Sequence, residues 1–270
     1  MIQIVRITTQ EDLLRLISEQ QEYNTDLDRY RSQYVYRGEH NATYHMCTSL
    51  TRNCKDCQED LERRLLKNFT KYAAFENPAI QDSVWKQMIL GQHHGLPTRL
   101  MDWTHSPLVA LHFAMAEPNL DEMDAHDAVV WRLDMEELHS LLPAPYRMLL
   151  REEQTSVFTV DLLNQVAPTT ERYDADMQDK SMVIIEPPSI DPRIISQFSF
   201  FSVVPSGMHD IDGFLNQNTQ NTIKYVIDKD LRWYARDMLD QLNISERTVY
   251  PGLDGLSRWL ARHYFVKSSK

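Results

Sequence analysis

One block, from Gly91 to Ala114, constrains the fold more than any other part of the sequence. It runs GQHHGLPTRLMDWTHSPLVALHFA, with polar side chains crowded into its first half and apolar ones into its second. A polar group that is buried without a hydrogen-bond partner costs about 1–3 kcal/mol. The polar half must therefore line a wet pocket or satisfy its own hydrogen bonds.

Both interpretations of this polar half remain open from the residues alone. In a self-satisfied network, Asp102 pairs with Arg99, and Ser106 caps the helix that follows. In a binding site, one of the adjacent His93 and His94 faces a pocket, since neighbouring side chains at a helix end point in different directions.

Apolar periodicity predicts helices on both sides of this block and at the two ends of the chain. The predicted helices cover 10–20, 59–75, 80–95, 106–116, 230–243 and 252–265. Short β-branched and aromatic runs predict strands at 33–38, 128–134, 181–187, 194–204 and 222–228. Gly95 is predicted to end one helix, and Pro107 suits the first position of the next.

The order of these elements predicts an α+β fold with a mixed or antiparallel central sheet flanked by helices. The 270 residues contain no repeat or low-complexity linker, so we expect one domain with an N-terminal helix and a C-terminal helical pair. Neither a dinucleotide-binding GxGxxG motif nor a P-loop motif is present.

Net charge and cysteine content bear on partners and location. A formal charge of -11 disfavours nucleic acid as a surface-bound partner, because binding its phosphates draws on clustered lysine and arginine. No leader sequence and no apolar run of membrane-spanning length is visible, so we expect no membrane partner. Three cysteines cannot all pair with one another. We therefore expect a cytoplasmic protein.

The cysteines follow the pattern His45-x-Cys47-x6-Cys54-x2-Cys57. These are ligand types of a structural zinc site. Only one CxxC pair is present, so free thiols are favoured and no metal is predicted. Redox pairing of Cys54 with Cys57 is the third alternative.

The segment YVYRGEH places an arginine and a glutamate on either side of a glycine at a predicted strand end. Arg37 could hold a carboxylate or phosphate through two parallel hydrogen bonds. Gly38 would allow a ligand to approach the backbone, and Glu39 could do acid–base work. The alternative is a buried Arg–Glu pair with a structural role.

Four stretches together resemble the FRG domain family. Tyr36–Gly38 matches its Phe/Tyr-Arg-Gly motif, and the block from Gln92 to Ala114 resembles its longest motif, with Met101 where leucine is usual. An Arg-Ile-x-x-Gln pattern occurs at 193–197 and a Pro-x-Leu-Asp-Gly-Leu pattern at 251–256. The resemblance spans about residues 36 to 259 and is typical of a bacterial, phage or fungal protein.

The family resemblance leads to a further hypothesis, a layout similar to the ADP-ribosyltransferase superfamily, with NAD as cofactor. Arg37 would hold the diphosphate or ribose, and Thr104 and Ser106 would fix the nicotinamide ribose. Gln197 or Glu39 would orient the ribose hydroxyl as positive charge develops at the anomeric carbon. The usual catalytic glutamate is replaced by Gln197. The remaining predicted nucleotide-binding residues are Gly38, His93, His94, Arg99 and Asp102.

Three classes of function remain open. The first is an NAD-consuming or ADP-ribosyl-transferring enzyme, in phage defence or as a toxin. The second is a non-catalytic nucleotide sensor that uses the same pocket. The third is a protein-interaction module whose polar block is structural. The first two require residues 37, 93–106 and 197 to wall a single cleft.

Overall fold

A mixed central sheet organises the computed structural model, which describes residues 1–18, 22–75 and 78–267. Within these residues the strands are β1 (Gln3–Ile7), β2 (Glu22–Asn24), β3 (Arg29–Arg31), β4 (Tyr34–Glu39), β5 (Leu100–Thr104), β6 (Ala128–Asp134), β7 (Phe158–Thr159), β8 (Val183–Glu186), β9 (Ser199–Val203) and β10 (Ile223–Ile227). Eight of them form one sheet in the order β1-β10-β6-β4-β5-β9-β8-β7, and β2 and β3 form a separate ribbon. The outer pairs β1–β10 and β7–β8 are parallel, and the inner pairs are antiparallel.

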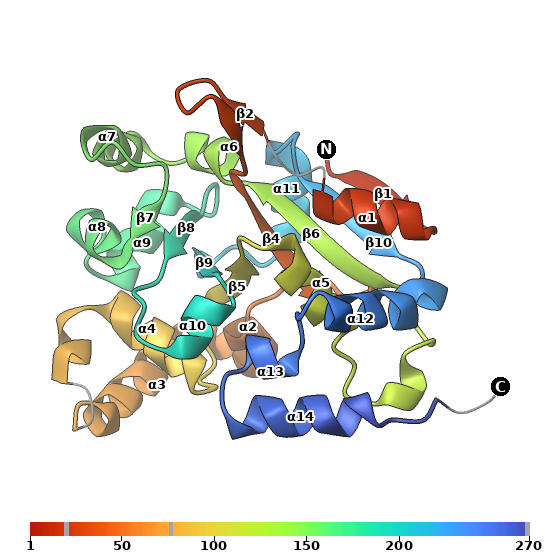
Figure 1. Cartoon of the computed structure of the whole chain (residues 1–270). Helices are drawn as coiled ribbons and strands as arrows, with labels where there is room; N and C mark the ends of the chain where they lie inside the picture. Colours follow the sequence, from red (N-terminus) through yellow and green to blue (C-terminus); the bar gives the residue numbers. More distant parts are fainter. Residues whose placement is uncertain (19–21, 76–77, 268–270) are drawn as a thin grey trace.

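Helices surround this sheet (Figure 1). In the described residues they are α1 (Gln10–Ser18), α2 (Ser49–Cys54), α3 (Gln58–Ala73), α4 (Val84–His93), α5 (Pro107–Met115), α6 (Met135–Ser140), α7 (Ala144–Glu152), α8 (Val160–Val166), α9 (Thr170–Met177), α10 (Pro192–Ser196), α11 (Ile211–Asn218), α12 (Arg232–Gln241), α13 (Glu246–Val249) and α14 (Leu253–His263). Short 3-10 turns occur at Lys55–Cys57, Pro78–Asp82, Leu120–Glu122 and Lys229–Leu231. The predicted α+β class with helices around a mixed sheet is confirmed.

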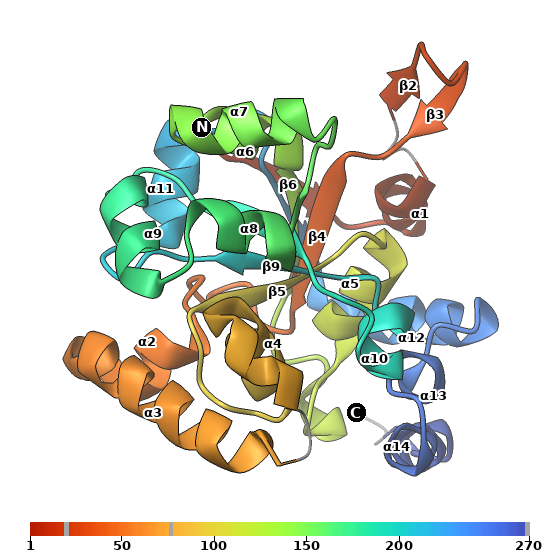
Figure 2. The same ribbon diagram turned by 90° about the vertical axis from the view of Figure 1, so that its left-hand side faces the viewer.

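Both faces of the sheet are buried, which explains why its central strands are apolar on both sides. In β6, Val129 and Trp131 belong to the cluster under α6 and α11, while Ala128 and Val130 face α5. On the α5 side, one cluster joins α1, α5 and α12 to β10, β6 and β4, and a second joins α4, α7, α8 and α9 to β5, β9 and β8. Figure 2 shows α5 between α4 and α12.

Helix α5 packs unusually close to β4. A Cβ atom on Gly38 would lie 1.8 Å from the main-chain oxygen of Ala110 and 2.5 Å from the nitrogen of Ala114. The close packing of α5 therefore requires glycine at position 38. The sequence analysis had instead explained Gly38 by the approach of a ligand to the backbone. The predicted start of this helix is confirmed, since the Ser106 hydroxyl accepts a hydrogen bond from the Val109 amide.

Several helices and strands begin or end at residues other than those predicted. The predicted strand 194–204 is divided, because residues up to Ser196 form α10 and β9 begins only at Ser199. The predicted helix 80–95 begins at Val84, and Gly95 follows its end with a φ of 86°, which favours glycine. Strand β5, which lies inside the polar block, was not predicted.

The C-terminal helices are joined by buried charges. Glu246 of α13 pairs with Arg236 of α12 and with Arg262 of α14, and Arg262 also pairs with Asp240 at 2.6 Å. Arg236 also donates a hydrogen bond to the main-chain oxygen of Met115 in α5. Burial raises the pKa of Glu246, but the two guanidinium groups outweigh it and hold that pKa at about 2.

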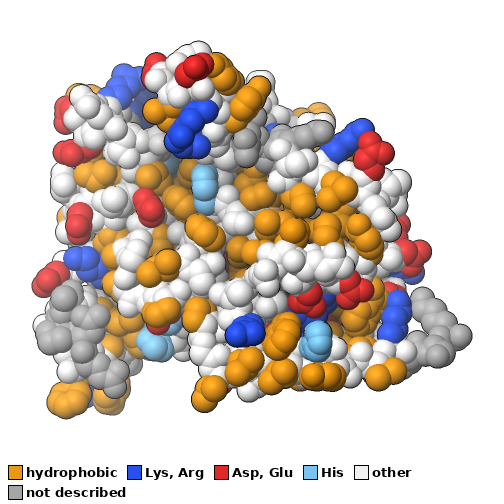
Figure 3. Space-filling view, viewed as in Figure 1, with side chains coloured by type: hydrophobic (Ala, Val, Ile, Leu, Met, Phe, Trp, Pro, Cys, Tyr) orange, Lys and Arg blue, Asp and Glu red, His pale blue; other side chains and the backbone are white. Residues whose placement is uncertain are grey.

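The surface is mixed in character. Figure 3 shows hydrophobic side chains gathered along the lower margin of the face seen in Figure 1, where α14 lies. Leu253, Leu260 and Tyr264 are exposed there. In the part of the chain that the structure describes, no helix has the length and apolar character needed to cross a membrane.

We expect the free energy of unfolding to fall as the pH drops from 7 to 5. Burial lowers the pKa of both His112 and His139 to about 4, whereas an unfolded histidine titrates near 6.5. The unfolded chain thus binds protons between pH 6.5 and about 4 that the folded chain excludes, and each histidine removes about 2 kcal/mol of stability by pH 5. Urea unfolding at both pH values measures this. The His112→Gln variant should show a smaller fall, and equal pH dependence in the two proteins would contradict the assignment.

Replacing Gly38 by alanine should lower the free energy of unfolding by about 3 kcal/mol or more, because the new methyl group meets main-chain atoms of α5. Gly91→Ala is the matched control. Its Cβ would meet only the side chain of Leu96, which can move, and alanine is the better helix former. We expect that variant to lie within about 1 kcal/mol of the parent by urea unfolding. Similar losses in both variants would show that α5 can shift away from β4.

Candidate functional site

The sheet opens between β4 and β5. These strands pair through a single register position, Tyr36 opposite Thr104, whereas β4 pairs with β6 along its whole length. Beyond that position, the Nη1 atom of Arg37 donates to the main-chain oxygen of Asp102 at 2.9 Å. The guanidinium group thus replaces the ladder hydrogen bonds that the strands no longer make.

A pocket of about 290 Å³ lies at this opening, and we call it the central pocket. Strands, α4, α5 and the α10 segment contribute its walls. The lining residues are Tyr36, Arg37, Gly38, Gln92, Asp102, Trp103, Thr104, Phe113, Arg193, Gln197 and Ser199. The three segments that the sequence analysis required to meet, around 37, 93–106 and 197, therefore do wall one cavity.

Arg37 combines the two roles that the sequence left open. Its Nε atom donates to Oε1 of Glu39 at 2.9 Å, and both side chains are largely buried, so the structural pair exists. The same guanidinium also lines the central pocket. Glu39 holds Arg37 in place from outside the pocket lining.

Gln197 forms part of the wall formed by α10, and it lies at the end of that helix. The predicted position on a strand was wrong, since β9 begins two residues later. Its main-chain oxygen accepts from the Thr104 hydroxyl at 2.6 Å, and its Nε2 atom donates to the main-chain oxygen of Val249 at 3.1 Å. These bonds aim the amide oxygen Oε1 independently of any ligand.

The remaining lining groups offer several kinds of contact. Asp102 is exposed, and its Oδ1 atom accepts from Nε2 of Gln92 at 2.9 Å. Phe113 is half-buried and presents a ring. Arg193 of α10 brings a second guanidinium group to the pocket. A site of this composition can bind an anion, orient hydroxyl groups and stack a flat ring.

Three predicted binding residues do not line the central pocket. His93 pairs with Asp191 at 3.2 Å, next to α10; burial lowers the pKa of this histidine, and Asp191 opposes that effect. His94 is exposed beside it, and Ser106 caps α5. These residues position the pocket walls or face solvent.

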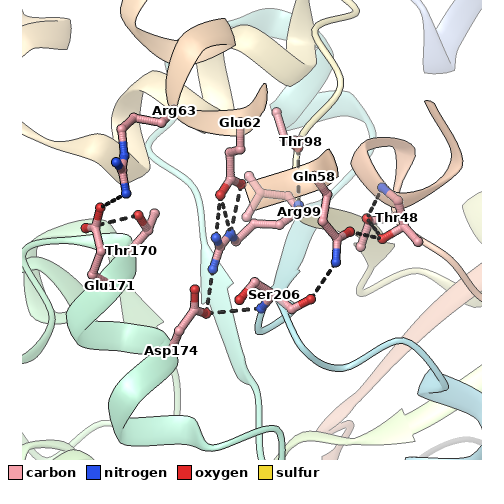
Figure 4. A network of polar contacts seen from close by, with 12 residues as sticks. Thr48, Gln58, Glu62, Arg63, Thr98, Arg99, Thr170, Glu171, Asp174 and Ser206 are labelled. Carbon is pink, nitrogen blue, oxygen red and sulfur yellow. Dashed lines mark hydrogen bonds and ion pairs between the residues drawn. The ribbon is translucent and has the colours of Figure 1, made fainter. Parts of the chain in front are cut away.

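Arg99 is the fourth predicted binding residue outside the pocket, and it belongs to a buried ion network (Figure 4). Its guanidinium group pairs with Glu62 of α3 and with Asp174 of α9, and Arg99 and Glu62 are both buried. Asp174 in turn accepts from the Ser206 amide at 3.1 Å. The pairing of Arg99 with Asp102, considered as the structural alternative, does not occur.

A larger hollow of about 490 Å³ lies beside this network, between α3, α4 and α9. Acidic and basic groups alternate along it, and Arg63 at its edge is already paired with Glu171 at 3.0 Å. Since its buried arginine is satisfied by two carboxylates, it has less unused binding capacity than the central pocket.

The cysteine segment forms no recognisable metal site. Cys47, Cys54 and Cys57 are free thiols, and His45 pairs with Asp212 at 3.0 Å. Among the described residues, no three histidine, cysteine or acidic side chains are grouped so as to hold a metal ion.

Several lining residues were not assigned to the site from sequence. Arg193 lies in the Arg-Ile-x-x-Gln pattern, which was noted without a role, while Gln92 lies in the central block. Nothing in the sequence pointed to Phe113 or Ser199 as pocket residues, because each belongs to an apolar run that predicts only burial. Their position depends on how α5 and β9 pack.

A family comparison bears directly on this region. The family model described as FRG domain matches residues 32–123. The chain contains an FRG domain. The match includes β4, α4, β5 and α5, and so two walls of the central pocket, while Arg193 and Gln197 lie beyond it. No curated protein and no solved structure matches the chain.

Removing one partner of the buried Arg99 network should be costly. We expect Glu62→Gln to lower the free energy of unfolding by about 3–5 kcal/mol, because Arg99 then stays buried with half of its countercharge. The adjacent Arg63→Gln is the control. It breaks only an exposed pair, which is worth about 1 kcal/mol or less. Urea unfolding measures both, and equal effects would show that the network is solvated.

Proposed function

We propose that the central pocket binds NAD or a related nucleotide and that the FRG domain protein cleaves its nicotinamide–ribose bond or transfers the ADP-ribosyl group. The observation that supports this most strongly is the meeting of Arg37, Asp102 and Gln197 around one cavity. They come from three segments that are far apart in the sequence.

The lining suits the nicotinamide mononucleotide half of the ligand. A volume of about 290 Å³ is at the lower end for ligand pockets, so only part of a dinucleotide fits inside. Arg37 supplies donors for a phosphate group, and the Phe113 ring supplies a surface for the pyridine ring. The adenosine half would then extend toward the mouth of the pocket.

In this reaction the protein positions the ligand and stabilises the charges that develop on it. The bond between the ribose anomeric carbon and the ring nitrogen breaks, and its electron pair leaves with neutral nicotinamide. Water or an acceptor hydroxyl group then attacks that carbon and releases a proton, which Asp102 can take up. Oε1 of Gln197 would accept from a ribose hydroxyl group and hold the sugar in line.

A second candidate is a nucleotide sensor without turnover. It is favoured by the amide of Gln197, which orients a hydroxyl group but lacks the negative charge that would stabilise the developing cation. Nucleotide binding without release of nicotinamide would support the sensor.

The double variant Arg37→Gln/Glu39→Gln should weaken NAD binding at least tenfold, because it removes the charge-assisted bonds to phosphate. Both substitutions keep the packing and remove the two charges together, so neither is left buried alone. We expect the melting temperature to change by only a few degrees. Isothermal titration calorimetry measures the binding, and nicotinamide release measures turnover.

His94→Gln is the matched control, because this residue was a predicted contact that lies outside the pocket. It should bind NAD as the parent does. If the parent protein neither binds NAD nor releases nicotinamide, the proposal is rejected. If the double variant unfolds, Thr104→Val tests the same pocket wall through its bond to Gln197.

A further inference from the structure

Two arginines flank the ring of Tyr250, which follows α13. The guanidinium carbon of Arg193 in α10 lies 4.8 Å from the ring centroid, and that of Arg258 in α14 lies 5.4 Å from it. Both views of the molecule show α10, α13 and α14 side by side (Figures 1 and 2). Helices α10 and α14 thus each bring one positive charge to the ring of Tyr250, which follows α13.

This cluster adjoins the central pocket. Arg193 lines the pocket directly. Phe113, another lining residue, packs edge-on against Tyr250, with ring centroids 6.3 Å apart. Burial raises the pKa of Tyr250, Arg193 and Arg258 oppose this effect, and Asp102 of the pocket adds to it. Tyr250 therefore lies next to the part of the pocket wall that Phe113 and Arg193 form.

Neither arginine is neutralised by the protein. In the described part of the chain, Arg193 and Arg258 have no carboxylate within ion-pair distance, whereas Arg99, Arg236 and Arg262 each have at least one. The chain as a whole carries a net charge of -11. Two like charges held at one ring repel each other, and a bound anion would remove that repulsion.

We propose that Arg193 and Arg258 form a second anion position at the mouth of the central pocket, which binds the outer phosphate group of a diphosphate ligand. The identification of that ligand as NAD rests on the proposed function. Arg37 and the pocket hold the nicotinamide mononucleotide half, which fills the available volume. The ligand class is therefore a dinucleotide or other diphosphate, and a mononucleotide uses only the inner part of the site.

Calorimetry on the full chain with three probes tests this position. The probes are NAD, nicotinamide mononucleotide and inorganic pyrophosphate. Arg258→Gln should raise the Kd for NAD and for pyrophosphate about tenfold, because a charge-assisted contact is lost. The Kd for nicotinamide mononucleotide should stay within about twofold of the parent value. The matched control is Arg247→Gln. It removes the same charge and a similar ring contact, which is made with Trp259 at 5.8 Å and not with Tyr250.

The outcomes separate this inference from the proposed function. If the parent binds NAD and Arg258→Gln behaves like Arg247→Gln, the second position is overturned and the proposed function stands. Equal weakening of NAD and mononucleotide by Arg258→Gln also overturns it. If the parent binds only pyrophosphate, and Arg258→Gln alone loses that binding, the anion position stands and the proposed function fails. A parent that binds none of the three probes rejects both.

Discussion

The contact between β4 and β5 rests on one residue pair, Tyr36 opposite Thr104, and on the Arg37 guanidinium group that spans the gap beyond it. The two halves of the sheet belong to separate hydrophobic clusters on the α5 side, and the side chains that line the pocket at this gap are mostly polar. Gly38 brings α5 close against β4 and closes the gap from one direction. A polar pocket in the middle of the sheet is the consequence.

Arginines serve two distinct purposes in this acidic chain. Some, such as Arg99 and Arg262, are buried with carboxylate partners and join helices that are distant in sequence. Their geometry is restrictive, because a buried charge is tolerated only where its partner is correctly placed. Arg193 and Arg258 have no such partner in the described residues, and both contact the ring of Tyr250. Arg37 lies between these two groups, because it is paired with Glu39 and also lines the pocket.

The pocket also links the FRG domain match to the rest of the chain. Residues 32–123 supply β4, β5 and α5, but the wall opposite them comes from α10. That wall is held by Val249, whose main-chain oxygen accepts from both Ser196 and Gln197. Since Val249 ends α13, the buried charges around Glu246 support the pocket wall indirectly. The C-terminal helices therefore belong to the site as much as the matched segment does.

Sequence and tertiary structure determined different parts of this protein. The sequence alone determined the helix after Ser106 and the strands at 128–134 and 222–228, because caps and apolar periodicity act over a few residues. It also indicated which segments meet at the pocket, through motif resemblance. Only the tertiary structure decided that Arg99 pairs with Glu62 and Asp174, since those carboxylates reach it once α3 and α9 have packed beside β5. Such pairings join residues that are distant in sequence, and no local pattern encodes them.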